Sequence, residues 1–424
     1  MKRIMIVAAL VCVARPSSAD DWPSWRGPAG NGVSDEKSVP VTWGAEENVR
    51  WKAPLPHRGN GSPVVSGGRV FVSCPEDDEG KRRSLYCFDR KDGKTLWVQT
   101  VDFGKRTPTH GTNPHSSSTP VTDGKRVVVF HDAAGLFCYD LDGKELWKRD
   151  LGEFRHPWGY GNSPILHDDR VILNSGPGKR VFVASFDLAT GKTLWETEEP
   201  VKGDGDTNSN GKGYMGSWCT PIVVKVAGKD QIVCAQPTRL VGYNPADGKI
   251  LWWAEGVQHD GGAHDLAYSS PILAGDTIVY VGGFGGPGIG VRLGGRGDVT
   301  PSLRLWRNAK EPQSIGTGVY LDGCVYVPFE GSIQCLDPRS GKTLWQDRGG
   351  AGSYWGSIVV AAGRCYLTSR NGTTVVFRPN PRKFELLASN ALGEDSNSTP
   401  AISNGEIFIR TFKNLYCIRG AQKP

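Results

Sequence analysis

The sequence lacks the short motifs that mark several large classes of enzyme. It contains no Cys-Cys dipeptide and no C-x-x-C-H sequence, so a haem attached through that motif is excluded. It has neither the G-x-S-x-G of serine hydrolases nor the H-E-x-x-H of zinc hydrolases. A glycine-rich stretch at residues 282–297 is not followed by Gly-Lys-Ser/Thr, which argues against a phosphate-binding loop and favours a long loop between strands. We therefore predict no catalytic residues.

Long apolar runs and basic runs are also scarce. The main apolar run, residues 4–14, follows Lys2 and Arg3 and precedes a Ser-Ser-Ala sequence that ends at Ala19. This order predicts a secretory signal peptide over residues 1–19, cleaved near Ala19. We expect a periplasmic or secreted protein with no membrane span. Loss of the three basic residues of the signal lowers the formal charge from +6 to +3, so we expect no nucleic-acid partner.

Ten cysteines in an exported chain raise the question of disulfides. Removal of Cys12 with the signal leaves an odd number. Four cysteines occupy one position of a repeated unit, where other units carry Ser or Gly, and we interpret them as buried small residues: Cys87, Cys138, Cys335 and Cys417. Cys219 and Cys234 flank one predicted hairpin, and the sequence allows either a disulfide or two thiols there.

A ten-residue unit recurs along the chain. It reads F-D-L-A-T-G-K-T-L-W at residues 186–195, with near copies at 88–97 and 336–345 and looser copies at 139–147 and 243–252. An Asp after an apolar run can start a turn, and Gly supplies the positive φ that closes a short hairpin loop. Because a lone hairpin is marginal in water, repetition about every 50 residues predicts stacked units that bury one another.

Counting the units gives eight. Residues 377–387 form a weaker copy, and residues 415–418 begin a unit that no strand follows. Residues 48–51 carry an unpaired strand ending in Trp51, which would complete that last unit. With four short strands per unit, the sequence predicts an all-β fold: an eight-bladed β-propeller of four-stranded antiparallel blades, closed by the N-terminal strand. Residues 20–424 would form this single domain.

The repeated D-x-x-T-G-K-x-L-W sequence resembles the pyrroloquinoline quinone (PQQ) enzyme repeat. The opening D-W-P-S-W-R-G-P at residues 21–28 and the glycine-rich insert at 291–299 resemble exported bacterial propellers related to the outer-membrane assembly protein BamB. The resemblance implies an eight-bladed propeller in which the tryptophan of each unit packs between blades. It leaves activity open, because the same repeat serves dehydrogenases and non-catalytic scaffolds.

Candidate binding residues precede the first strand of several units, at one rim of the predicted channel. These segments are rich in aromatic and polar side chains, which suit a planar ligand or a peptide. Our candidates for contacting a cofactor or ligand are Asn162, Trp218, Asp265, Tyr268, Trp355 and Asn397. Histidine and aspartate at 259–265 have the composition of a metal site but no evident third partner, so we predict no metal centre.

Two functions from different classes remain open. The first is an exported, non-catalytic scaffold without a cofactor. It would be a monomer that binds a protein, a peptide or another ligand of the cell envelope through its rim and central funnel. The second, implied by the resemblance, is an oxidoreductase that uses PQQ and Ca²⁺ and acts on alcohols or sugars. The quinone dehydrogenases with this repeat usually carry adjacent cysteines over the cofactor. Their absence here favours the scaffold.

Overall fold

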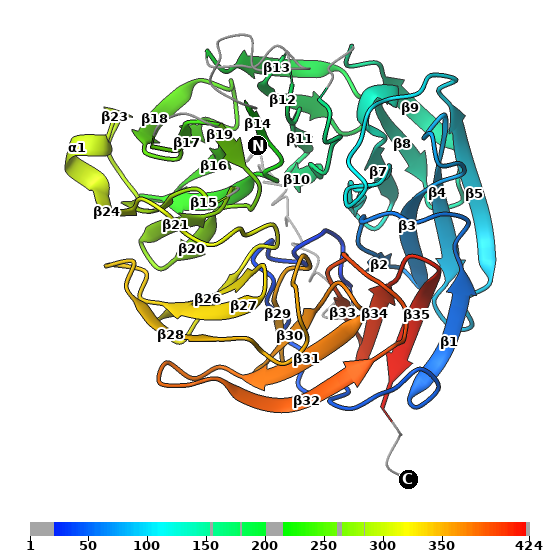
Figure 1. Cartoon of the computed structure of the whole chain (residues 1–424). Helices are drawn as coiled ribbons and strands as arrows, with labels where there is room; N and C mark the ends of the chain where they lie inside the picture. The colour runs from blue at the N-terminus through cyan, green and yellow to red at the C-terminus, as the bar shows by residue number, and fades with distance from the viewer. Residues whose placement is uncertain are drawn as a thin grey trace, which may run out of the picture.

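Each repeated unit folds as a small antiparallel sheet, and the sheets stand as blades around a central channel (Figure 1). The computed structural model describes residues 21–152, 156–178, 180–200, 215–260, 265–283 and 285–420. The described chain forms eight blades, which confirms the predicted all-β, eight-bladed propeller. The predicted signal peptide and His264 lie outside the described residues. No described helix is long and apolar enough to cross a membrane.

The first four blades follow one another along the chain, and each runs from an inner to an outer strand. Their strands are β2 (Val64–Ser66), β3 (Arg69–Pro75), β4 (Arg82–Asp89) and β5 (Thr95–Asp102); β6 (Val121–Thr122), β7 (Arg126–Phe130), β8 (Leu136–Asp140) and β9 (Glu145–Arg149); β10 (Ile165–His167), β11 (Arg170–Asn174), β12 (Phe182–Asp187) and β13 (Thr193–Glu198); and β15 (Ile222–Val226), β16 (Lys229–Ala235), β17 (Arg239–Tyr243) and β18 (Ile250–Glu255). A 3-10 turn at Asp132–Ala134 joins β7 to β8.

The last four blades have the same order, and the eighth takes its outer strand from the other end of the chain. Their strands are β20 (Ile272–Ala274), β21 (Thr277–Val281), β22 (Gly288–Arg292) and β24 (Arg304–Asn308); β25 (Val319–Leu321), β26 (Cys324–Phe329), β27 (Ser332–Leu336) and β28 (Thr343–Asp347); β29 (Val359–Ala361), β30 (Arg364–Thr368), β31 (Thr373–Arg378) and β32 (Glu385–Ala391); and β33 (Ala401–Ser403), β34 (Glu406–Arg410), β35 (Asn414–Arg419) and β1 (Val49–Pro54).

The glycine-rich stretch at residues 282–297 is not the predicted long loop, because β22 lies within it and the insert at residues 291–299 adds a further strand. Within it, β23 (Gly297–Asp298) pairs in parallel with β18 of the preceding blade, and the single turn α1 (Thr300–Leu303) follows. The insert thus gives blade 4 a fifth strand. A second parallel pair, β14 (Met215–Ser217) with β19 (Asp265–Ala267), links the segments that lead into blades 4 and 5.

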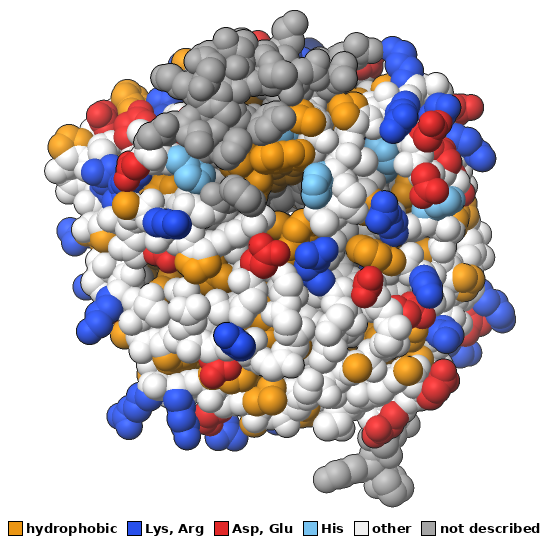
Figure 2. All heavy atoms as spheres, viewed as in Figure 1, with side chains coloured by type: hydrophobic (Ala, Val, Ile, Leu, Met, Phe, Trp, Pro, Cys, Tyr) orange, Lys and Arg blue, Asp and Glu red, His pale blue; other side chains and the backbone are white. Residues whose placement is uncertain are grey.

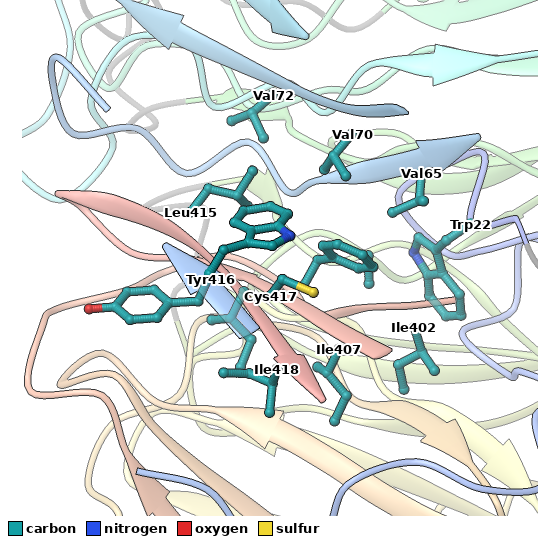
Figure 3. Close-up of a cluster of buried hydrophobic side chains, with 14 of the residues drawn as sticks. Trp22, Val65, Val70, Val72, Ile402, Ile407, Leu415, Tyr416, Cys417 and Ile418 are labelled. Atoms are coloured by element: carbon teal, nitrogen blue, oxygen red, sulfur yellow. The ribbon is translucent and has the colours of Figure 1, made fainter. Parts of the chain in front are cut away.

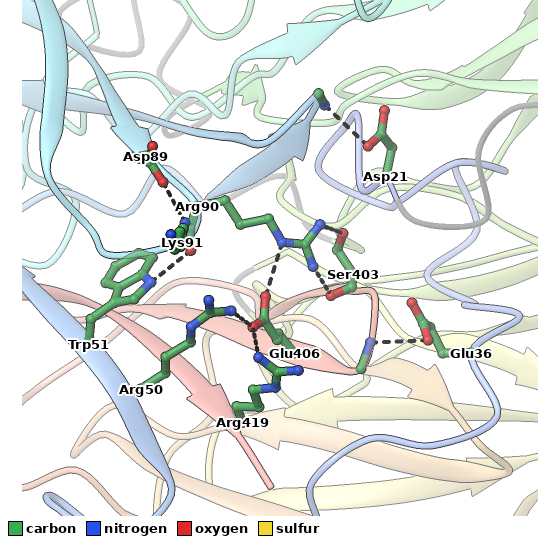
Figure 4. A network of polar contacts seen from close by, with 12 residues as sticks. Asp21, Glu36, Arg50, Trp51, Asp89, Arg90, Lys91, Ser403, Glu406 and Arg419 are labelled. Carbon is green, nitrogen blue, oxygen red and sulfur yellow. Dashed lines mark hydrogen bonds and ion pairs between the residues drawn. The ribbon is translucent and has the colours of Figure 1, made fainter. Parts of the chain in front are cut away.

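The eighth blade is completed as the sequence predicts. In the β1–β35 pair, Trp51 lies opposite Cys417, and the side chains around this pair form one apolar core with Trp22 and the strands of blade 1 (Figure 3). Polar contacts reinforce the same seam between blades 8 and 1 (Figure 4). The buried Glu406 carboxylate pairs with Arg50 and, at 3.0 Å, with Arg90 of blade 1, while Trp51 Nε1 donates to the Arg90 carbonyl at 2.8 Å.

The tryptophans of the repeated unit connect neighbouring blades. Trp195 of blade 3, for example, donates from Nε1 to the Pro245 carbonyl of blade 4 at 2.8 Å, and its ring lies against Gly248 in the turn of that blade. Five others make the equivalent bond to the next blade: Trp51, Trp97, Trp147, Trp306 and Trp345. Trp252 differs, because the insert replaces the usual turn in blade 5, and its Nε1 donates to Gln231 of its own blade.

A closed ring of hydroxyl groups surrounds the channel. Two residues before the first strand of every blade stands a buried Ser or Thr, and the two types alternate: Ser62, Thr119, Ser163, Thr220, Ser270, Thr317, Ser357 and Thr399. Each backbone N–H donates to the hydroxyl of the next blade at 2.9–3.1 Å, and the N–H of Thr399 donates to Ser62. This ring, which we call the hydroxyl ring, fixes the spacing of the segments that precede it.

The segment before β1 crosses one opening of the channel. Trp22 pairs with Val65 of blade 1, whereas the Arg26 guanidinium reaches the segments that lead into blades 6 and 7 and donates to the Gly318 and Ile358 carbonyls at 2.7 and 2.8 Å. Between them, Trp25 Nε1 donates to the Thr399 hydroxyl of the ring at 3.1 Å. The segment therefore covers this opening of the channel. A cavity remains in the channel between the segment and the opposite rim.

Candidate functional site

A cavity of about 660 Å³ occupies the channel above Trp25. This volume falls in the range of about 300–1,000 Å³ typical of small-molecule sites. Figure 2 shows a hollow near the centre of this face, bordered by hydrophobic side chains. Six members of the hydroxyl ring contribute to the lining, together with side chains from the rim: Asn60, His110, Thr112, Asn113, Trp158, Trp218, Tyr268, Gln313, Glu330, Trp355, Arg370 and Asn397.

One wall of the cavity is aromatic. The rings of Trp158 and Trp218 stack with centroids 6.1 Å apart, and Tyr268 meets Trp218 edge-on at 5.2 Å. Trp218 is held in place, because its Nε1 donates to the Gly159 carbonyl at 3.0 Å and the buried His156 ring packs edge-on against it at 4.9 Å. All three aromatic residues are partly exposed, so their rings offer a preformed apolar surface to a ligand.

A second aromatic surface comes from blade 7. The Arg370 guanidinium lies 4.8 Å from the centre of the Trp355 ring, so one face of that ring is covered by a cation–π contact. The Trp355 Nε1 is buried and has no hydrogen-bond partner among the described residues. It is therefore an unpaired donor in the wall of the cavity.

The remaining side of the cavity carries amides. Asn397, buried to more than nine-tenths, donates from Nδ2 to Asn60 Oδ1 at 3.2 Å and to the Thr112 carbonyl at 3.1 Å. Within the described chain its Oδ1 has no donor. Asn113 is fixed by bonds from Nδ2 to the Trp158 and Tyr160 carbonyls at 2.7 and 3.0 Å. The amides thus tie blades 1, 2, 3 and 8 together and leave an acceptor facing no protein donor.

The lining is close to electrically neutral. Among the described lining residues, the only side chains that are charged near neutral pH are the exposed Glu330 and the partly exposed Arg370, which balance one another. His110 is exposed at the mouth and bonds the Thr112 hydroxyl at 2.7 Å. A strongly charged ligand would therefore find little compensation here.

Four of the six candidates predicted from the sequence come together in this cavity: Trp218, Tyr268, Trp355 and Asn397. The other two do not line it. Asn162 is fully buried, and its Nδ2 joins the Ser217 and Cys219 carbonyls at 3.0 and 3.1 Å. Asp265 begins β19, and its carboxylate accepts from the His259 backbone at 3.2 Å.

Comparison with known proteins places the chain in a family. The family model described as outer membrane protein assembly factor BamB matches residues 33–102, 81–328 and 329–418. The chain belongs to this BamB family. BamB of Yersinia pestis is 24% identical over 309 residues, covering 70% of this chain and 72% of that protein. A polyvinylalcohol dehydrogenase of a Pseudomonas species is 22% identical over 203 residues, covering 43% of this chain, which spans only 29% of that enzyme.

Solved structures with the same fold include both classes of protein. A europium-containing methanol dehydrogenase superposes with a TM-score of 0.68 at 13% identity, over 94% of this chain and 91% of that chain. BamB from Moraxella catarrhalis superposes with a TM-score of 0.59 at 11% identity, over 88% and 97%. At these identities the likeness concerns the fold alone.

PQQ and Ca²⁺, which the resemblance of the repeat implied for an enzyme, do not fit the residues of this cavity. Ca²⁺ takes about 6–8 oxygen ligands, usually with several carboxylates, whereas Glu330 is the one carboxylate among the described lining residues. No group of three or more His, Cys, Asp or Glu side chains suited to a metal occurs in the described chain. PQQ is a flat polyanion, and the cavity offers it the single guanidinium of Arg370.

The cysteines of the described chain provide no surface that could cover a cofactor in the cavity. Cys219 and Cys234 lie with their sulfurs 3.6 Å apart, fully buried, and all cysteines of the described chain are free thiols. Burial raises the pKa of Cys234 well above its ordinary value, so this thiol is not a ready nucleophile. The four repeat-position cysteines are buried, as predicted.

Sequence reasoning missed several lining residues. Glu330 and Arg370 stand in the turns between the second and third strands of blades 6 and 7, and Gln313 precedes blade 6. In a four-stranded meander, that turn lies on the same rim as the segment before the first strand. The strand order alone could therefore have directed attention to these turns.

Proposed function

We propose that this chain is an exported, non-catalytic propeller scaffold whose rim and channel cavity bind a component of the cell envelope. The observation that carries the proposal is the cavity itself, with its fixed aromatic wall and its buried donor and acceptor that lack protein partners. Binding needs such a preformed surface. The described lining lacks a buried acid–base pair and a suitable cation site, which chemistry at this position would need.

The relatives support the class of partner. The family model and two curated relatives carry the name of an outer membrane assembly factor, so a protein or peptide of the envelope is the natural partner class for the rim. The predicted signal peptide at residues 1–19 supports export to the periplasm, and we propose that the mature chain acts there as a monomer.

Site-specific photocrosslinking tests this proposal. A photoreactive p-benzoylphenylalanine placed at His110, at the cavity mouth, should give a discrete adduct when cells producing the protein are irradiated. The same probe at Leu344, exposed on the outer strand β28, serves as the matched control and should give none. Adducts at Leu344 alone would contradict a binding site in the channel.

An activity assay tests the non-catalytic part. The purified mature protein, given PQQ and Ca²⁺, should not reduce a redox dye with alcohols or aldoses as electron donors. Turnover that disappears in Trp218→Ala or Asn397→Ala, with thermal unfolding unchanged, would instead establish a quinone-dependent oxidoreductase.

A further inference from the structure

We infer that the channel cavity binds a neutral oligosaccharide. This inference rests on the proposed function and adds a ligand for the cavity, distinct from the protein or peptide partner proposed for the rim. A pyranose ring has an apolar face of C–H groups and a rim of hydroxyls, and each hydroxyl can donate and accept a hydrogen bond. A site for such a ligand needs flat aromatic surfaces, mixed donors and acceptors, and little net charge.

The aromatic surfaces come from separate blades. Trp158 and Trp218 form a stacked pair on one wall, with their ring centroids 6.1 Å apart. Trp355 stands on blade 7 with Arg370 covering one of its faces, which directs ligand contact to the rest of the ring. Two separate aromatic surfaces in one cavity of about 660 Å³ suit a chain of sugar rings better than a single small planar molecule.

The polar groups are of the mixed kind that sugar hydroxyls require. Trp355 Nε1 is a buried donor and Asn397 Oδ1 a buried acceptor, and neither has a partner in the described chain. A buried polar group without a partner costs free energy, which a ligand hydroxyl would recover. The hydroxyl ring adds donors: each ring oxygen already accepts a backbone N–H, and no bond from these hydroxyls to a described acceptor is present.

The charge of the lining favours a neutral oligosaccharide over a polyanion or a cation. Glu330 and Arg370 balance one another, so neither a polyanion such as a quinone cofactor nor a cation gains net attraction. A peptide would bring backbone donors and acceptors as well, but it extends as a strand or helix and pairs best with an exposed backbone edge. The described cavity presents side chains and ring hydroxyls instead.

Calorimetric titration of the full mature protein with defined tetrasaccharides tests the inference. The probes are cellotetraose, maltotetraose, xylotetraose, mannotetraose and chitotetraose, each carried to millimolar concentration. At least one should bind with saturation, and Trp218→Ala and Trp355→Ala should each weaken that binding about tenfold or more. Tyr320→Ala removes an aromatic ring at the opposite opening of the channel and should leave the affinity unchanged.

Four outcomes would overturn the inference, and they differ in what they say of the proposed function. Sugar binding that survives both tryptophan changes would place the sugar elsewhere. Binding of short neutral peptides, but of no tetrasaccharide, would leave the scaffold standing with a different ligand, as would saturable binding of PQQ without turnover. Absence of any binding, together with no adduct from His110, would reject the scaffold as well. Thermal unfolding of each variant shows whether it has folded.

Discussion

His131 is the residue whose titration has the clearest consequence for stability. Its ring is fully buried, packs edge-on against Phe137 at 5.6 Å, and has no hydrogen-bond partner for either nitrogen in the described chain. Burial, and then the charge of Arg83, lower the pKa of His131 to about 3. Burial and the same arginine lower the pKa of His115 to about 4. Both side chains are therefore neutral in the native state.

Acid should weaken the fold through these two histidines. Between pH 6.5 and pH 4 the unfolded chain binds protons that the native state does not, so stability is complete above about pH 6.5 and falls as the pH is lowered. His131 alone should account for a loss on the order of 3 kcal/mol by pH 4, at about 1.4 kcal/mol per pKa unit. Urea unfolding across this range should show a shallower pH dependence for His131→Phe, whereas His110→Phe at the exposed rim should follow the wild type.

The individual side chains of the cavity differ in how well the sequence predicted them. Trp218, Tyr268 and Trp355 were predictable, because aromatic residues stand out in segments that precede a strand. Asp265 was chosen as a polar side chain of the same kind of segment, yet its carboxylate accepts a backbone N–H from His259. In an irregular segment, side-chain direction has no period that a sequence could reveal. Arg370 was missed because it is one arginine in a short turn, and only the strand order places that turn on the same rim.

At the scale of single elements, the contact between a tryptophan and the next blade's turn is the repeated joint of the molecule. The glycine of the turn has positive φ, and at Gly248 a Cβ would stand 2.4 Å from the Trp195 ring. The glycine is therefore required twice, for its backbone conformation and for the close approach of the ring. This joint explains why the G-K-T-L-W sequence recurs so closely.

Replacing two glycines separates these requirements. Gly248→Ala should lower the free energy of unfolding by about 3 kcal/mol, because overlap with Trp195 adds to the strain of positive φ. Gly228→Ala, at a turn with φ +78° and open space, should cost about 1 kcal/mol. Urea unfolding of both variants checks the difference. Equal losses would mean that the tryptophan contact contributes nothing measurable.

The elements were largely predictable from the sequence. Hairpins follow from Asp, Gly and alternating apolar residues, and the pairing of Trp51 with the last unit follows from a strand without a partner. The insert at 291–299 was not predictable in detail. Its strand β23 forms by pairing with β18, so its conformation depends on a neighbour more than 40 residues away and not on its own residues.

At the scale of the whole molecule, the ring is closed inside blade 8, where β1 pairs with β35 from the other end of the chain, and the seam with blade 1 lies beside this pair. Glu406 is buried there between Arg50 and Arg90. Glu406→Gln removes the charge that both guanidinium groups contact, so we expect a loss of about 3 kcal/mol in unfolding free energy. Asp142→Asn removes an exposed pair with Arg69 between blades 1 and 2 and should cost less than about 1 kcal/mol. Thermal and urea unfolding compare the two seams, and an equal effect would contradict a special role for Glu406.

The hydrogen bonds of the hydroxyl ring all run in the same direction around the channel and form a closed circle. Every blade donates once to its successor and accepts once from its predecessor, and the bond from Thr399 to Ser62 has the same length as several of the others. The hydrogen bonds of the ring are therefore the same at blade 8, where the two ends of the chain pair, as at every other blade. Because Ser and Thr alternate, a loss or gain of a single blade would set two residues of one kind beside each other, whereas a change by two would not. The repeating unit of the channel wall is therefore a pair of blades.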